Sequence, residues 1–99
     1  MARYLMEWHI VEALMPGSPK EIAISWKKLA TLVNEDLRKG NLKDWGAYPG
    51  ERRGYSIFEG TDLELMKMTT QYAPHVSFTV HQVSGLETVV SFLDAVSRG

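Results

Sequence analysis

The stretch Pro74–Val83, which reads P-H-V-S-F-T-V-H-Q-V, decides how this chain is expected to fold. Hydrophobic and polar residues alternate along it, and a β-strand places successive side chains on opposite faces. The apolar face of the expected strand carries Val76, Phe78 and Val80. The polar face carries two histidines, and its members are His75, Ser77, Thr79 and His81. The apolar face must meet a hydrophobic core, so what the polar face meets becomes the functional question.

The rest of the chain alternates between strand and helix patterns. Arg3–Val11 is expected to be the first strand, because every second residue from Tyr4 to Ile10 is apolar. The elements expected to follow are a helix from Pro19 to about Lys39, strands at Leu42–Tyr48 and Gly54–Gly60, a short helix from Thr61 to about Tyr72, and a tail helix at residues 85–97. Gly46 and Gly54 interrupt the two middle strands and indicate bulges or close backbone approach.

Each expected helix begins with a Ser or Thr followed three residues later by Glu, which is the capping-box pattern. The three motifs are S-P-K-E at 18–21, T-D-L-E at 61–64 and S-G-L-E at 84–87. Apolar residues then recur at helical spacing and predict the buried stripes. These stripes are Ile22, Trp26, Leu29, Val33 and Leu37 in the long helix, Leu63, Met66, Thr70 and Ala73 in the short helix, and Leu86, Val89, Val90, Leu93 and Val96 in the tail helix.

The order of these elements predicts a single α+β domain over residues 1–99. Strand, helix, strand, strand, helix, strand is the ferredoxin-like βαββαβ plan, with an antiparallel four-stranded sheet and a tail helix added. Right-handed crossovers put both helices on one face of the sheet. The first and last strands are then neighbours, and Glu7, His9, His75 and His81 all fall on the uncovered face.

Composition excludes several classes of function. Eleven Lys and Arg balance twelve Asp and Glu, and no basic stripe favours nucleic acid as a partner. No apolar run is long enough to span a membrane, so we expect no membrane partner. The chain has no cysteine, which excludes disulfides and thiolate metal sites and fits a cytoplasmic location. We expect no cofactor, because no phosphate-binding, dinucleotide or metalloprotease motif is present.

Three segments carry a resemblance to known proteins: M-A-R-Y-L-M-E-W at residues 1–8, L-K-D-W-G at 42–46 and G-Y-S-I-F-E-G at 54–60. With the layout and length of the chain, they resemble the dimeric α+β-barrel superfamily of the ferredoxin-like class, and most of all a small family of uncharacterised proteins within it. The superfamily includes muconolactone-isomerase-like and cofactor-free monooxygenase-like proteins. The resemblance implies a homodimer whose sheets face each other and enclose a cavity. It carries over no catalytic residue.

The candidate site residues come from the expected uncovered face of the first and last strands and from the two middle strands, whose facing the sequence leaves open. Glu7, His9 and His81 are the candidates for proton transfer, because imidazole gains or loses a proton near neutral pH. His75, Trp45, Tyr55, Glu59 and Thr79 are the candidates for ligand contact. His75 and His81 lie about 20 Å apart along a strand, too far to share one ion, so a metal site is not predicted. The alternative is that these side chains are hydrogen-bonded residues of an interface or its rim.

Three functions remain open from the sequence. The first is a homodimer with a small-ligand cavity on the uncovered sheet face, without known catalysis. The second is a cofactor-free isomerase or monooxygenase that uses His9 or His81 with Glu7 for proton transfer. The third is a protein-interaction subunit that uses the sheet face or the tail helix. Whether the chain is an enzyme is undecided at this level.

Overall fold

The computed structural model describes residues 2–15 and 17–99. Its elements are β1 (Ala2–Ile10), the short 3-10 helix η1 (Glu12–Leu14), α1 (Pro19–Lys39), β2 (Leu42–Ala47), β3 (Arg53–Gly60), α2 (Asp62–Thr70), β4 (Val76–Val83) and α3 (Leu86–Ser97). Every expected helix and strand is present. The chain is α+β, as predicted, with three α-helices and one antiparallel sheet.

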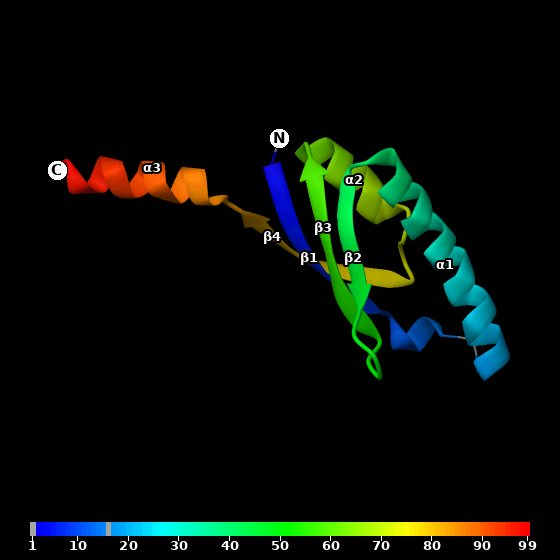
Figure 1. Cartoon of the computed structure of the whole chain (residues 1–99). Helices are drawn as coiled ribbons and strands as arrows, with labels where there is room; N and C mark the ends of the chain where they lie inside the picture. Colours follow the sequence, from blue (N-terminus) through cyan, green and yellow to red (C-terminus); the bar gives the residue numbers. More distant parts are fainter. Residues whose placement is uncertain (1, 16) are drawn as a thin grey trace.

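The four strands are arranged in the order β2-β3-β1-β4 (Figure 1). This order is consistent with the predicted ferredoxin-like fold. β1 lies between β3 and β4 and is antiparallel to both. Glu7 faces Tyr55 on one side and Thr79 on the other, so the predicted adjacency of the first and last strands is confirmed.

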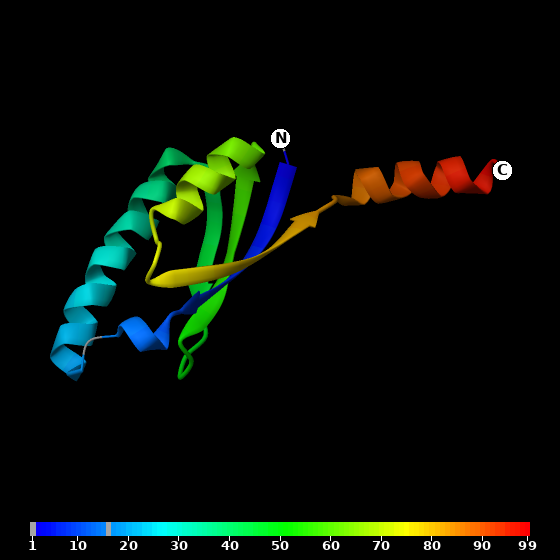
Figure 2. The ribbon, with the colours of Figure 1, turned by 180° about the vertical axis from the view of Figure 1, so that it is seen from behind.

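One face of the sheet carries the hydrophobic core. Tyr4, Met6 and Trp8 of β1 are buried there, as the alternation predicts, together with Phe58 of β3. Residues of α1 and α2 pack on the same cluster, which confirms that both helices cover one face. Figure 2 shows the two helices from behind, with α1 inclined so that its N-terminal half stands away from the strands.

The boundaries of α1 follow from local signals at both ends. Ser18 accepts a hydrogen bond from the Glu21 backbone N–H at 3.1 Å, and Pro19 occupies the first helical position. Gly40 ends the helix in the left-handed conformation, with φ of 93°. The predicted span from Pro19 to Lys39 is therefore confirmed.

The packing predictions for α2 and for one residue of α1 are wrong. In α2 the predicted stripe faces solvent, because Leu63 is 61% and Met66 66% exposed, while Met68 and, just beyond the helix, Tyr72 are buried. Met68 and Tyr72 have the same helical spacing as the predicted stripe and belong to the hydrophobic core cluster. In α1 the predicted Leu37 is exposed and its neighbour Asp36 is buried.

Val80 and the third capping box also differ from expectation. Val80 lies on the predicted apolar face of β4 but is exposed, although its partner Met6 in β1 is buried, because β4 is the edge strand of the sheet. Gly85, and not Ser84, is the N-cap of α3, and no side-chain hydrogen bond caps that helix.

The two strand glycines permit close approach, as predicted. A Cβ on Gly54 would lie 2.0 Å from the Gly46 carbonyl oxygen and 2.5 Å from the Trp8 ring. A Cβ on Gly46 would lie 2.5 Å from the Tyr55 ring. The register of β2 also shifts between Leu42 and Asp44, which is an irregularity away from the two glycines at which the sequence indicates a bulge or close approach.

The C-terminal end of the chain projects from the body. Beyond the end of β4, the whole of α3 extends away from the sheet and from the other helices (Figures 1 and 2). The molecule measures 61 × 26 × 19 Å, and its radius of gyration is 16.8 Å. A compact chain of this length has a radius of gyration of about 13 Å.

Candidate functional site

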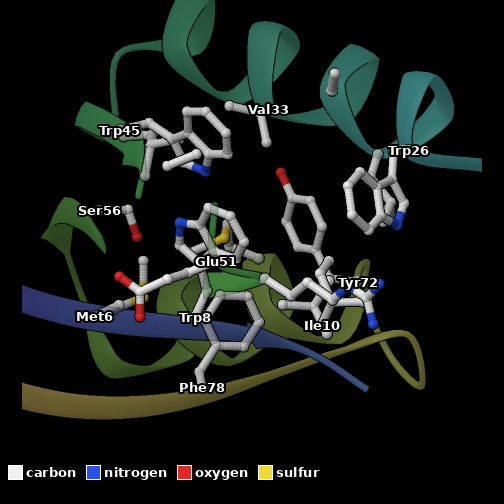
Figure 3. Close-up of a pocket in the computed structure, with 17 residues that line it drawn as sticks. Met6, Trp8, Ile10, Trp26, Val33, Trp45, Glu51, Ser56, Tyr72 and Phe78 are labelled. Carbon is white, nitrogen blue, oxygen red and sulfur yellow. The ribbon is translucent and has the colours of Figure 1, made fainter. Parts of the chain in front are cut away.

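A cavity of about 240 Å³ lies between α1 and the helix-covered face of the sheet (Figure 3). It exists because the inclined α1 does not close on the strands over its whole length. The strands contribute Met6, Trp8, Ile10, Ser56 and Phe78, and α1 contributes Trp26, Leu29, Ala30 and Val33. Trp45, Met68 and Tyr72 complete most of the wall. The lining is therefore almost entirely apolar and aromatic.

Two stacked tryptophans form one wall of this cavity. The rings of Trp8 and Trp45 lie 5.1 Å apart and are nearly parallel, with an angle of 6° between them. Trp8 is held further because its indole N–H donates to the Tyr55 carbonyl oxygen at 3.2 Å. Trp45 faces Ser56 across the β2–β3 pair, so it lies on the helix-covered face and is half-buried there.

A buried hydrogen bond fixes the opposite wall. The Tyr72 hydroxyl donates to Asp36 Oδ2 at 2.8 Å, and both side chains are buried. Burial, followed by this hydrogen bond to the Asp36 carboxylate, raises the pKa of Tyr72 well above its usual value. Tyr72 therefore stays protonated at physiological pH and ties α1 to the segment that follows α2.

The polar groups in the cavity are few. Ser56, which is 2% exposed, contributes a hydroxyl from β3. Glu51 and Arg52 complete the lining from the exposed connection between β2 and β3. Arg52 also pairs with Glu12 at 3.4 Å. An apolar hollow with a few placed polar groups is the usual form of a small-molecule site.

The uncovered face of the sheet brings together part of the predicted site. His81 Nε2 lies 3.8 Å from Glu7 Oε1, and Thr79 lies opposite Glu7 in the neighbouring strand. His9 lies opposite Arg53 of β3 and Ser77 of β4. His81 is four residues further along β4 than Ser77, so the two histidines are well separated. The structure therefore brings Glu7 to His81 and not His9 to His81.

Two other candidates on this face have partners of their own. The Tyr55 hydroxyl donates to Asp44 Oδ2 at 2.7 Å, and this bond raises the pKa of Tyr55. Glu59 forms an ion pair with Arg3 at 2.9 Å. The uncovered face thus contains a row of polar pairs.

The remaining candidate, His75, lies apart from the other two histidines. It precedes β4, and its carbonyl oxygen accepts a hydrogen bond from the Val11 N–H at 2.9 Å. Its side chain lines a separate hollow against α1, with Glu21 and Lys28.

Sequence reasoning missed most of the cavity. The sequence predicts Trp8 and Trp26 as core residues, and Ser56 and Tyr72 are not among the predicted site residues. Of the five predicted ligand contacts, Trp45 alone lines this cavity. A signal for Tyr72 was present, because a large aromatic residue continues the stripe of Met68 beyond the end of the short helix. No signal in the sequence gives the inclination of α1, which opens the space.

Within residues 2–15 and 17–99, no three His, Asp or Glu side chains lie close enough together to share a metal ion. Over the same described ranges, no helix has both the length and the apolar character needed to cross a bilayer. No protein-family model matches this chain, and the search of curated proteins found no match.

Proposed function

We propose that this chain binds a small, largely apolar molecule in the cavity between α1 and the sheet. The observation that carries this proposal is the apolar hollow of about 240 Å³. Pockets for drug-sized ligands measure about 300–1,000 Å³, and an apolar cavity of about 150 Å³ accepts benzene. The volume therefore suits a molecule of one or two rings.

The lining supports an aromatic ligand. The flat faces of Trp8 and Trp45, with Trp26 and Tyr72, offer stacking and edge contacts to a ring. The Ser56 hydroxyl offers one polar contact, which suits a ligand with a single hydroxyl or carbonyl group. The arrangement favours a phenol-like or naphthol-like compound over a sugar or a nucleotide.

Calorimetric titration with 2-naphthol tests this proposal. Ala30→Phe places a ring at the cavity wall and is expected to weaken binding about tenfold or more. Ala23→Phe makes the same change at an exposed position of α1 outside the lining, and it should bind as the wild type does. Equal affinities in the two variants would show that 2-naphthol binds elsewhere, and no saturable binding by the wild type would overturn the proposal.

We also propose that the chain forms a homodimer through the uncovered sheet faces, as a dimeric α+β barrel. Leu5 and Ile57 support this, since they are paired aliphatic residues in the middle of a face that is mostly polar apart from Val83 at its end. Among the described elements, no helix covers that face. A second sheet would remove both side chains from water.

The Glu7–His81 pair favours a second candidate function, proton transfer without a cofactor on the uncovered face. A carboxylate beside an imidazole can hold the ring in place while it accepts or donates a proton. NMR during the 2-naphthol titration separates the two candidates. Movement of the tryptophan indole signals supports the cavity, and movement of the His81 ring signals alone supports the uncovered face.

A further inference from the structure

We propose that the C-terminal arm, residues 80–97, packs against the body of a second copy of this chain. The arm comprises the outer end of β4 and all of α3. Every residue of α3 is exposed, and among its apolar side chains Leu86 is 78% and Phe92 62% exposed. Val80 and Val83 of β4 are exposed as well.

The apolar side chains of α3 form one broad stripe. At about 100° per residue, the six positions cover about 160° of the helix circumference. They are Leu86, Val89, Val90, Phe92, Leu93 and Val96. The opposite side is polar and carries Glu87, Ser91 and Asp94. A stripe of this width is broader than a coiled-coil seam, so a pair of α3 helices alone would leave part of it in water. The surface that α3 meets must therefore include more than another α3.

The exposed area matches what a dimer of this kind would bury. The chain has an accessible surface of 7011 Å². A compact monomer of 11.2 kDa exposes about 5,700 Å². The excess is about 1,300 Å² per chain, or about 2,600 Å² for two, which falls within the range of obligate homodimers.

The geometry of the arm favours a second copy over the chain's own body. β4 remains paired with β1 as far as Val83, opposite Arg3. Only Ser84 and Gly85 separate β4 from α3, and Gly85 is extended, with φ of −74° and ψ of 170°. The helix therefore continues away from the sheet. A return to its own sheet would require a reversal within two residues.

The charges on α3 argue against a membrane surface as its partner. Helices that lie on membranes carry Lys and Arg on their polar side. The polar side of α3 carries Glu87 and Asp94 instead, and its last turn has no basic residue. A second copy has the same exposed apolar surface. The two copies form a closed, symmetric pair in which the arm of each chain packs against the body of the other.

This inference rests on the proposed homodimer, and light scattering after gel filtration at micromolar concentration tests the two separately. The wild type should have twice the 11.2 kDa chain mass. Leu93→Glu places a charge in the stripe and should raise the dimer dissociation constant about tenfold or more. Ser91→Glu, on the polar side of α3, should remain dimeric. Ile57→Glu is the corresponding variant of the uncovered sheet face.

Each outcome decides between the two surfaces. A Leu93→Glu protein that stays as dimeric as the wild type overturns the role of the arm, whereas a dimeric Ile57→Glu protein overturns the sheet-face contact alone. A wild type that is monomeric overturns both, whether α3 then folds back, binds vesicles or stays free. Trp8, Trp26 and Trp45 all lie in the body, so tryptophan emission verifies that each variant is folded.

Discussion

Gly54 lies where the backbones of β2 and β3 and the ring of Trp8 come together. A methyl group there would meet the Gly46 carbonyl oxygen at 2.0 Å, and a backbone atom cannot move aside as a flexible side chain can. We expect Gly54→Ala to lower the free energy of unfolding by about 1–3 kcal/mol, the usual cost of overpacking. Urea denaturation followed by tryptophan fluorescence measures this. Gly17→Ala, where nothing lies within 4 Å, is the control and should change little.

Tyr72 and Asp36 form the buried hydrogen bond that joins the two helical segments. Tyr72→Phe removes the donor and leaves the Asp36 carboxylate without it. A hydrogen bond to a charged group contributes about 1.5–3 kcal/mol, and we expect a loss of that order at pH 7. Tyr48→Phe, at an exposed position, is the control. A loss no larger than that of the control would show that the bond adds no net stability.

The raised pKa of Tyr72 also predicts how stability depends on pH. The unfolded chain releases the Tyr72 proton near the usual value of 10.0, while the folded chain retains it. Above that pH the unfolded state binds fewer protons, so the free energy of unfolding falls as pH rises. Hydrogen bonds to carboxylates, followed by burial, also raise the pKa of Tyr4 and Tyr55, which adds to the fall in stability. Urea denaturation at pH 8 and at about pH 11 should show a smaller fall for Tyr72→Phe than for the wild type.

At the scale of elements, α2 and α3 begin with the same sequence pattern but different caps. In α2 the Thr61 hydroxyl accepts from the Glu64 N–H at 3.2 Å, and the Glu64 carboxylate accepts from the Thr61 N–H at 2.9 Å. Thr61→Ala should therefore cost about 1 kcal/mol. Ser84→Ala should cost little, because no side chain caps α3. Thermal unfolding of the two variants measures the contrast, and equal losses would contradict it.

The Glu64 cap also makes the free energy of unfolding depend on pH in the acidic range. Hydrogen bonds from Thr61 hold the pKa of Glu64 below its usual value. The unfolded state then binds more protons as the solution becomes acidic, so the stability from this cap is present above the usual value of 4.5 and is lost as pH falls. Glu64→Gln, which removes the titrating carboxyl group, should reduce the loss of stability between pH 6 and about pH 3, as measured by urea denaturation.

How far the sequence predicts each element depends on whether its signals are local. The ends of α1 follow from Ser18, Pro19 and Gly40, and the faces of β1 follow from strict alternation. Two stripes of α2 have the helical spacing of a buried face. Tertiary packing against the sheet, which has no local signal, determines that Met68 is buried and Met66 is exposed. Trp45 was placed on a strand but not on a face, because the bulge beside Lys43 shifts the register. The cavity depends on the angle of α1, which no local pattern encodes.

At the scale of the whole molecule, the body and the arm have different requirements. The body has buried residues from β1, β2 and β3 and from both of its helices, and β4 adds the half-buried Val76 and Phe78. α3 has an apolar stripe as strong as that of a core helix but no core to enter in a single chain. Periodicity predicts the apolar stripe of α3 correctly. It gives no indication of whether the same chain or another chain covers that stripe.

The proposed dimer makes thermal stability depend on concentration. If folded chains associate and unfolded chains do not, mass action stabilises the folded state more at higher protein concentration. We expect the midpoint of thermal unfolding of the wild type to rise by several degrees over a hundredfold increase in concentration, since about 1 kcal/mol shifts the midpoint of a domain this size by about 4–8 °C. Leu93→Glu should remove this dependence if the arm supplies the contact, while Ser91→Glu should retain it. A wild-type midpoint that does not change with concentration would mean that the apolar side of α3 is exposed in the molecule that unfolds.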